Sequence, residues 1–568
     1  MSLGGALQIG RTGLMASQAA IEVAGNNLAN IATRGYHRKE ITLVPAPAEE
    51  IQAGIFSGRG VQVKQIVRQV NEALEARLRG GISDHSRSLT QRDLLSQIEA
   101  IENEFSDVDL STQLVSFFNV WSQLANDPQN ISLRSLVMQE GVTLASFIRG
   151  LRNDLTEIRA QADQALDGAT LAANNLLLQI EKVNLEIMRT ERGQGGAHGL
   201  RDQRDVLLGE LAKYLDISTI EQPGGAIDVF VGSTPIILVG RSRGIEVRKQ
   251  TINNQLQIEV IVSDDSTVVK PTSGQIGALI KSRGKDVNSA VDFLDDFTTK
   301  FIFEINRLHS QGQGLRGHEM VFSTNRVTDP ALALNDSVVG LDFVPQHGSF
   351  RIGVTNKITG QRVTHTIDVD LDGLTDGVDT TLTSLAAALG SSPGVLAEIT
   401  PAGILKISGV SGDYQVSFSD DTSGILAALG INSFFVGSQA VDIDVNQIIL
   451  DEPSLLAVGR GHLNGDNRTA LALAGLRDEP LDAFNGMSIT EAWGRHVEDY
   501  AIRLNRLHQQ VDADSVVLEN LEAQQQRISG VNADEATIDL LSFQRTYQAS
   551  ARFLSVVDEL LETLLSIV

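Results

Sequence analysis

The chain has 568 residues, more than one hydrophobic core usually holds, so three or four structural units are expected. Its composition, 42% hydrophobic and 21% charged, is typical of a folded soluble protein. The formal net charge of -25 argues against binding to nucleic acid or anionic lipid. The absence of cysteine excludes disulfides, thiolate metal sites and a cysteine nucleophile.

An apolar heptad pattern covers the first thirty or so residues and predicts a helix that packs along one side. One seam consists of Leu7, Leu14, Ile21 and Leu28. A companion seam of mostly small residues, which permits close helix approach, consists of Leu3, Gly10, Ser17, Ala24 and Ile31. This stretch lacks the apolar core and the early basic cluster of a signal peptide, so any export is expected to use a route without a cleaved signal.

Three asparagines, Asn26, Asn27 and Asn30, stand where this helix is expected to end, and Gly35 and Tyr36 follow. Neutral amides both donate and accept hydrogen bonds, so they can satisfy helix-end carbonyls or bond neighbouring copies without like-charge repulsion. Ordinary C-capping is the alternative for each of them. The stretch is therefore interpreted as a joint between a terminal helix and the body.

Further helices are predicted at 74–105, 144–187, 287–308 and 497–511, from apolar residues at three- and four-residue steps. Between 222 and 270 the period changes to two, as in half-buried strands. From about 327 to 446 the chain is strand-rich, with "SFRIGV", "RVTHTIDV", "ILKISG", "YQVSFS" and "AVDIDV" separated by turn residues and interrupted by one short helix, "LTSLAAALG". Helix resumes after about Asp466.

The last thirty residues carry heptads again. Their seams are Leu540, Tyr547, Leu554, Leu561 and Val568, and Phe543, Ser550, Val557 and Leu564. Each terminal stripe is too apolar to remain in water, so the two ends are expected to pack on each other or on neighbouring copies.

These elements predict an α+β, elongated, multi-domain protein with paired terminal coiled-coil helices. Between them we expect a long helical bundle with a small β section and an inserted β-rich outer domain. The expected division is 1–60 for the N-terminal axial helix and turn, 61–326 and 451–534 for the helical rod domain, 327–450 for the insert and 535–568 for the C-terminal axial helix.

Two motifs mimic ligand sites. "GQGLRG", Gly312–Gly317, has the G-x-G-x-x-G spacing but follows a helix instead of a strand, so a glycine-rich helix exit is the preferred interpretation. The loop from Asp368 to Asp379 has EF-hand spacing, but its last position is Asp and its flanks are not helices. Its candidate calcium ligands are Asp368, Asp370, Asp372, Asp376 and Asp379, and an acidic β-turn connection is the alternative. No catalytic signature, cofactor motif or paired metal-ligand spacing is apparent elsewhere, so no enzyme is expected.

Both ends of the chain resemble the terminal signatures of one group of proteins. "SLGGALQIGRTGLMASQAAIEVAGNNLANIATRGYHRKEI" is similar to the N-terminal signature of the flagellar axial proteins, and "SGVNADEATIDLLSFQRTYQASARFLSVVDELLETLL" to their C-terminal signature. The internal "LRDQRDVLLGELAKYLDI" and "FEINRLHSQGQGLRG" resemble the hook-associated family within this group, which joins hook to filament. That family usually has Thr-Pro-Gly-Tyr after the asparagines, whereas this chain has Thr33-Arg34-Gly35-Tyr36, which removes a fixed φ.

The resemblance implies a non-enzymatic structural protein, located outside the cell at the hook–filament junction. It implies self-assembly in a ring-like junction, contacts with the hook protein and hook-associated protein 3, and export by the flagellar type III secretion system. A cytoplasmic export chaperone is expected on the C-terminal segment. Another axial protein, such as a hook or distal rod protein, would share the two ends but not the internal segments. A cell-wall hydrolase carried on the insert and a calcium-dependent extracellular adhesin are the alternatives from other classes.

The residues expected at the assembly interface are Leu7, Leu14, Ile21, Asn26, Asn27, Leu28, Asn30, Gly35, Tyr36, Leu540, Phe543, Tyr547, Leu554, Val557, Leu561 and Leu564. A lone amphipathic helix of about thirty residues is marginal without a packing partner. Residues 1 to about 60 and about 535 to 568 are therefore predicted to be mobile in the free monomer and to order on assembly.

Overall fold

The computed structural model describes residues 3–52, 54–102, 109–192, 196–252, 255–374, 378–461, 463 and 465–567. The fold is α+β and groups into two compact units. Unit 1 comprises Met1–Leu94, Gln161–Arg283 and Asn505–Val568, and unit 2 comprises Leu95–Ala160 and Gly284–Leu504. Three long helices contribute residues to both units: α2 (Glu72–Glu102), α4 (Ile131–Glu191) and α12 (Ile489–Ser529). None of the described helices is long and apolar enough to cross a membrane.

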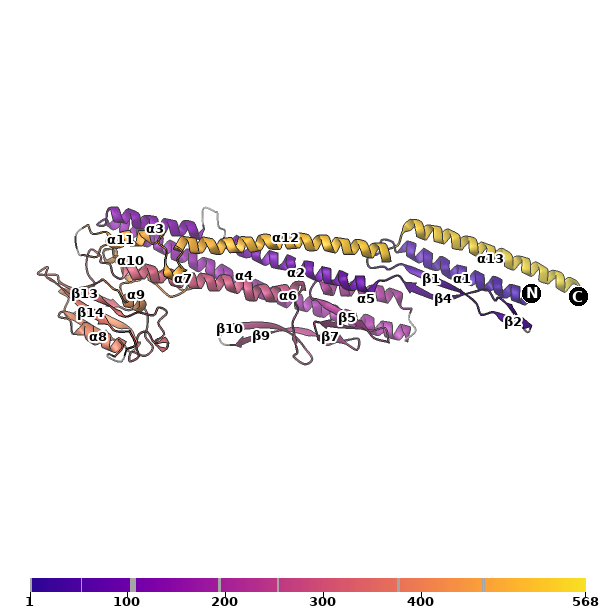
Figure 1. Cartoon of the computed structure of the whole chain (residues 1–568), viewed down its shortest axis with the longest axis horizontal. Helices are drawn as coiled ribbons and strands as arrows, with labels where there is room; N and C mark the ends of the chain where they lie inside the picture. The colour runs from indigo at the N-terminus through magenta and orange to yellow at the C-terminus, as the bar shows by residue number, and fades with distance from the viewer. Residues whose placement is uncertain are drawn as a thin grey trace. The chain divides into compact units, whose positions relative to one another are not determined.

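The two ends of the chain pair within unit 1, as the heptads predict. Helix α1 (Leu3–Ala29) packs along helix α13 (Ala533–Ile567), and both chain ends lie at the same end of this pair (Figure 1). The helices run antiparallel, because Gly10 lies against Leu554 whereas Gly13 lies against Ser550. We call α1 and α13 the terminal pair.

A two-stranded ribbon, which the sequence pattern does not predict, lies against α1. Strands β1 (Lys39–Pro45) and β4 (Val61–Arg68) pair antiparallel, from Lys39 opposite Arg68 to Pro45 opposite Val61. A short hairpin of β2 (Glu49–Gln52) and β3 (Ile55–Ser57) extends from the far end of the ribbon (Figure 1). None of the residues of β1 and β4 is buried, so the short apolar–polar alternations Ile41-Thr42-Leu43 and Val61-Gln62-Val63-Lys64 do not mark a face that packs into a core.

The rest of unit 1 is a helical frame around two small antiparallel sheets. Helices α5 (His198–Ala212) and α6 (Gly274–Ser282) accompany the unit 1 parts of α2, α4 and α12. One sheet has the order β5 (Ile217–Glu221), β6 (Ile227–Val231), β7 (Thr234–Leu238) and β8 (Arg241–Ser242); the other has β11 (Val268–Val269), β10 (Gln255–Val262) and β9 (Ile245–Ile252). Their apolar faces share a core with α4, α5 and α6. The β section predicted between 222 and 270 is thus present.

Unit 2 combines helices with a β-rich section. Its helices are α3 (Leu110–Asn126), α7 (Asn288–His309), α9 (Ile425–Leu429), α10 (Gln447–Asp451) and α11 (Arg468–Gly475), and the π-helical turn Arg283–Val287 precedes α7. Short 3-10 turns occur at Ser337–Val339, Pro453–Leu455 and Asp482–Phe484. No helix is predicted from the sequence at α3, which Asp109 caps by accepting a hydrogen bond from the Thr112 backbone N–H.

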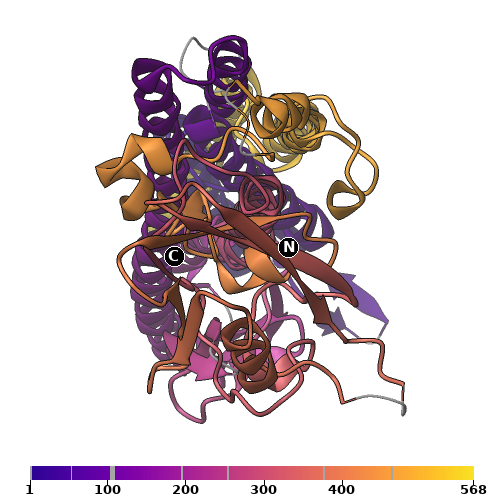
Figure 2. The ribbon, with the colours of Figure 1, turned by 90° about the vertical axis from the view of Figure 1, so that its left-hand side faces the viewer.

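The β-rich section of unit 2 has its own hydrophobic core, between Val321 and Ile431. One sheet has the order β14 (Arg362–Val369), β13 (Gly348–Asn356), β17 (Tyr414–Ser419); the other has β12 (Met320–Phe322), β16 (Leu405–Gly409), β15 (Val395–Ile399). The predicted short helix is present as α8 (Leu382–Gly390), which begins with a capping box of Thr381 and Ser384. Figure 2 shows these strands and α8 in brown.

One predicted strand is wrong over most of its length. Of "AVDIDV", 440–445, only Asp444–Val445 forms a strand, β19, paired with β18 (Phe435–Val436). The preceding residues form a turn, in which the Asp442 carboxylate accepts hydrogen bonds from the Ser438 and Gln439 backbones. Local side-chain bonding of this kind competes with a strand ladder. Phe105, expected in the helix that begins at Leu74, lies outside the described residues.

Candidate assembly site: the terminal pair and its joint

Small residues allow the two terminal helices to approach closely. A Cβ added to Gly10 would lie 2.7 Å from Leu554 Cδ2, and one added to Gly13 would lie 3.0 Å from Ser550 Oγ. Ser17 and Ala24, which continue the small-residue seam, are buried. The seam with small side chains is thus the more deeply buried one, as its sequence favours.

The larger apolar side chains of the terminal pair remain half in water. Those predicted at the interface and found half-buried are Leu7, Leu14, Ile21, Leu28, Leu540, Phe543, Tyr547, Leu554 and Leu561. Of the other two residues predicted at the interface, Val557 is buried, whereas Leu564 is exposed and does not take part in the contact between α1 and α13. Within the chain, the pair therefore covers only part of its apolar surface.

Helix α13 carries a second apolar stripe that the heptad analysis misses. It consists of Ile538, Leu541, Phe553, Val556, Leu560 and Leu564, all exposed, and we call it the outer stripe. Val556 and Leu560 each expose 54% of their surface. A search for apolar residues at the 3.6-residue period of an α-helix, instead of at exact seven-residue intervals, would have revealed this second face. A helix that is apolar on two sides needs more than one packing partner.

The asparagines tie the end of α1 to the turn that follows, which we call the joint (26–39). The buried Asn27 side chain donates from Nδ2 to the Lys39 carbonyl at 2.8 Å and accepts from the Lys39 backbone N–H at 2.9 Å. The Tyr36 hydroxyl donates to Asn27 Oδ1 at 2.8 Å and to Asn26 Oδ1 at 3.1 Å. Asn30 Nδ2 donates to the Asn26 carbonyl at 2.9 Å, so it satisfies a helix-end carbonyl. These bonds are all internal to the chain.

Gly35 fits a position that no other residue fills without strain. Its φ is +74°, in the left-handed region, and an added Cβ would lie 2.1 Å from Val206 Cγ2 on α5. The turn thus persists although Arg34 stands where the resembled family usually has proline. Tyr36 follows, and burial together with nearby Asp202 raises its pKa to about 12.

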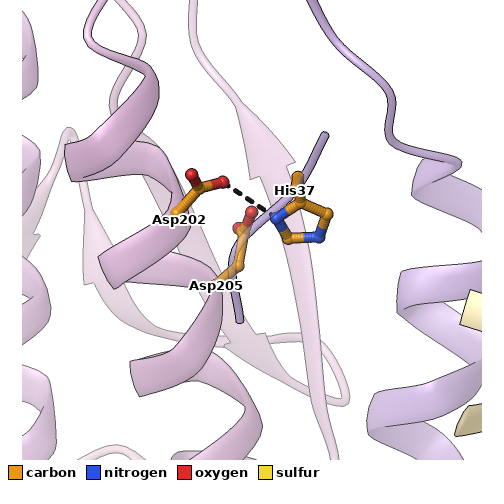
Figure 3. Close-up of side chains that lie close together, drawn as sticks. All are labelled: His37, Asp202 and Asp205. Atoms are coloured by element: carbon orange, nitrogen blue, oxygen red, sulfur yellow. Dashed lines mark hydrogen bonds and ion pairs between the residues drawn. The ribbon is translucent and has the colours of Figure 1, made fainter. Parts of the chain in front are cut away.

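A buried charge cluster anchors the joint to the body of unit 1 (Figure 3). His37 Nδ1 lies 2.8 Å from Asp202 Oδ1 on α5, as Figure 3 shows together with Asp205. His37 Nε2 lies 3.6 Å from Glu75 Oε1 on α2. Arg68, at the root of the ribbon, donates from Nη1 to Asp202 Oδ1 at 2.7 Å and to Asp205 Oδ2 at 2.8 Å. We call these five side chains the charge cluster.

The charge cluster favours the protonated form of His37. Burial lowers the pKa of His37, but the hydrogen bonds to Asp202 and Glu75 outweigh this effect and raise it to about 9. His37, Asp202 and Asp205 lie close enough together to hold a metal ion. However, Asp202 Oδ1 already faces both the imidazole and the Arg68 guanidinium, so the geometry suits ion pairing better than metal ligation. Sequence reasoning misses this cluster because His37 and Asp202 are 165 positions apart.

Residues of both motifs make structural contacts in this fold. In the Gly312–Gly317 segment, a Cβ at Gly314 would lie 2.3 Å from the Ser454 carbonyl oxygen, so glycine permits close backbone packing after α7. In the acidic loop, the Asp372 carboxylate accepts from the Leu374 backbone N–H at 2.9 Å and that of Asp379 from Gly373 at 3.3 Å.

The remaining acidic positions lie at the start of that loop. Asp368 is in strand β14, and Asp370 Oδ1 lies 3.3 Å from His347 Nδ1. His347, Asp370 and Asp372 could together hold an ion, although His347 and Asp372 are exposed. Asp376 lies outside the described residues. Calcium binding by this loop stays a prediction.

Comparison with known proteins agrees with this architecture. The family model of the helical domain of flagellar hook-associated protein FlgK matches residues 95–321. Models of the flagellar basal body rod proteins match 7–37 and, for their C-terminal region, 524–567. The first match covers the internal segments that a hook or rod protein is not expected to share.

Curated relatives extend the match to the whole chain. Flagellar hook-associated protein 1 of Salmonella typhimurium is 24% identical over 581 residues, covering 98% of both chains. The protein of the same name from Escherichia coli K12 is 23% identical, again over 98% of both. A solved structure of the flagellar hook junction protein FlgK from Burkholderia pseudomallei matches 80% of this chain and 100% of its own, with TM-score 0.50 and 15% identity, which supports the fold.

The paired terminal helices and the helical domain between them define a structural axial protein of the bacterial flagellum, without enzymatic activity. Within that class, the chain belongs to the family of flagellar hook-associated protein 1 (FlgK), the hook–filament junction protein.

Proposed function

We propose that this chain connects hook to filament by packing its terminal pair against the terminal pairs of neighbouring copies in a ring-like junction. The observation that carries the proposal is the apolar surface left on the pair: a half-buried seam on α1 and the exposed outer stripe on α13. Burying such side chains contributes about 1.5–3 kcal/mol each before ordering costs. Neighbouring copies offer the same apolar surface and can bury it.

The expected division of the chain follows from this role. Residues 1–60 and 535–568 form the axial part, 61–326 and 451–534 the rod domain, and 327–450 an outer domain with few axial contacts. The separate core of the β-rich section supports an outer domain that folds on its own contacts. Deleting 327–450 should leave incorporation largely intact, and loss of incorporation would show that the insert carries axial contacts.

The partners and route come from family membership and from the same exposed surface. The junction is expected outside the cell, with the hook protein on one side and hook-associated protein 3 on the other, after export by the flagellar type III secretion system. Before export the outer stripe of α13 is exposed to the cytoplasm, where large apolar patches favour aggregation. A cytoplasmic chaperone that covers the C-terminal segment removes this hazard.

Complementation of cells that lack the gene tests the proposal. Without the protein, electron microscopy should show hooks without filaments, and filament subunits should appear in the medium. The full chain should restore filaments, whereas a chain ending at Asn532, without α13, should fold in its body yet fail to join the junction. Filaments that attach without the protein, or a truncated chain that is incorporated normally, would contradict it.

A further inference from the structure

The side of α1 that points away from α13 carries a row of exposed residues. Gly10 and Gly13 lie against α13. The exposed row consists of Arg11, Met15, Gln18 and Glu22. Successive members are three or four residues apart, so they share one face of the helix. Met15 exposes 58% of its surface, which is high for a large apolar side chain. We call these four residues the outer row of α1.

Helix α13 carries charged residues beside its outer stripe. Arg545, Arg552 and Glu559 are exposed and follow each other at intervals of seven residues. Val556 of the outer stripe is four residues after Arg552 and three before Glu559, so it lies next to both on the helix surface. An apolar stripe flanked by charges at heptad spacing is typical of a helix that recognises a partner helix.

The charges on these two faces are not paired within the chain. Among the described residues, Arg11, Arg545 and Glu559 have no ion-pair partner. Glu22 accepts a hydrogen bond only from Gln18 of its own helix, at 3.3 Å. Exposed charges of this kind add little to the stability of a single chain, but they select the partner and the register when two chains meet.

The order of the charges is complementary when the two faces are placed antiparallel. Helices α1 and α13 run antiparallel within the chain, so neighbouring copies of one orientation also place α1 antiparallel to the next copy's α13 (Figure 1). Arg11 can then face Glu559 while Glu22 faces Arg545. At 1.5 Å per residue the two charges are about 16 Å apart on α1 and about 21 Å apart on α13, a difference that long side chains can bridge.

The charges also select the axial position of the neighbour. Gly10 is level with Leu554 in one chain, so an unshifted neighbour would place Arg11 beside Arg552, and two like charges would meet. A shift by one helical turn, about 5.4 Å, moves Arg11 toward Glu559 and brings Glu22 level with Arg545. The same shift leaves Met15 within about one turn of Val556.

We propose that the outer row of α1 in one copy packs against α13 of the next copy, with Arg11 facing the next copy's Glu559 and Glu22 facing its Arg545. The inference rests on the proposed assembly and names the faces and the register through which the terminal pairs meet. The contact is heterologous, so each pair uses α1 toward one neighbour and α13 toward the other. Copies stay side by side with a small stagger, and α1 and α13 alternate around the axis.

Disulfide trapping tests the register directly, since the chain contains no cysteine. The variant Glu22→Cys with Arg545→Cys should form an oxidation-dependent ladder of linked copies in isolated flagella. Within one chain these two positions lie on the outward sides of different helices, so the bond forms only between copies. The matched control, Glu22→Cys with Arg552→Cys, places the second cysteine seven residues further along the same face of α13 and should give no more than about a tenth of the linked product.

The outcomes separate this inference from the proposed function. No ladder from the incorporated Glu22→Cys and Arg545→Cys variant, or a control ladder of equal strength, would overturn the register and leave the proposed function intact. Failure of the cysteine-free parent to restore filaments would overturn the proposed function itself.

Charge reversal gives an independent readout. Glu22→Arg and Arg545→Glu should each lower incorporation roughly tenfold, because the resulting like-charge pair repeats in every copy. Combining them should recover most of the loss, whereas Glu22→Arg with Arg552→Glu, the matched control, should not. Thermal melting of the free variants should be unchanged, since these side chains are exposed. A double variant that is no better than either single variant, or equal recovery in the control, would overturn the pairing.

Discussion

The aromatic core of unit 2 and the terminal pair of unit 1 differ in how completely they bury their apolar side chains. In unit 2, Phe117, Trp121, Phe301, Phe434 and Phe435 are all fully buried, and Phe434 lies 5.6 Å from Phe117 and 5.5 Å from Trp121 between ring centroids. In the terminal pair most large side chains are half-buried and the outer stripe is exposed. The aromatic core buries its apolar side chains within the chain, whereas the terminal pair leaves apolar surface exposed that neighbouring copies can cover.

The largest loss of stability should therefore come from the aromatic core. Phe434→Ala should lower the free energy of unfolding of the body by about 3–5 kcal/mol, through lost burial and the cavity left behind. Denaturant unfolding measures this, with the exposed Phe322→Ala as a control that should change little. Equal effects of the two substitutions would show that the core is not as tightly packed as described.

The charge cluster should give a smaller, pH-dependent effect. The pKa of His37, raised from 6.5 to about 9, corresponds to roughly 3 kcal/mol of stabilisation. Because the folded-state pKa is the higher one, this stabilisation is complete below about pH 6.5 and is lost as the pH rises through about 9.

Thermal melting between pH 6 and pH 10 checks this expectation. The midpoint of the free chain should fall toward alkaline pH, and His37→Gln should have a lower midpoint with a flatter pH profile. If the melting midpoint falls equally at alkaline pH in the unmodified chain and in His37→Gln, titratable groups other than His37 cause the fall.

The outer stripe should show the smallest change in stability and the clearest loss of function. Val556→Glu with Leu560→Glu should leave the free energy of unfolding of the monomer within about 0.5 kcal/mol, since both side chains are exposed. Incorporation at the junction should nevertheless be lost. The matched control, Gln544→Glu with Gln548→Glu, adds the same charge at exposed positions of α13 that lie outside the stripe. Loss of incorporation in both would indicate a charge effect instead of an apolar contact.

The sequence predicts the terminal pair because a seven-residue apolar repeat within one segment is enough to mark the face on which its helix packs. It also predicts helix α8 and the main strands of the β-rich section, where turn residues bound short apolar runs. The ribbon is not predicted because none of the residues in its two strands is buried, so their apolar side chains do not mark a core-facing side. The charge cluster escapes it because the partners of His37 come from α2, α5 and the ribbon root, and only the fold brings them together.

The joint sharpens the expectation that the ends of the free monomer are mobile. His37 and Arg68 hold the residues after α1 to α5 through buried ion pairs, so the ordered body should begin at the joint. Mobility is then expected in α1 and α13 themselves, where apolar surface remains uncovered.

Amide hydrogen exchange of the free monomer and of assembled flagella tests the central claim most directly. In the free monomer, Leu3–Ala29 and Ala533–Ile567 should exchange rapidly while α3 and α7 are protected, and in the assembly both terminal helices should become protected. Strong protection of α1 and α13 in the free monomer would contradict the claim that neighbouring copies complete this interface.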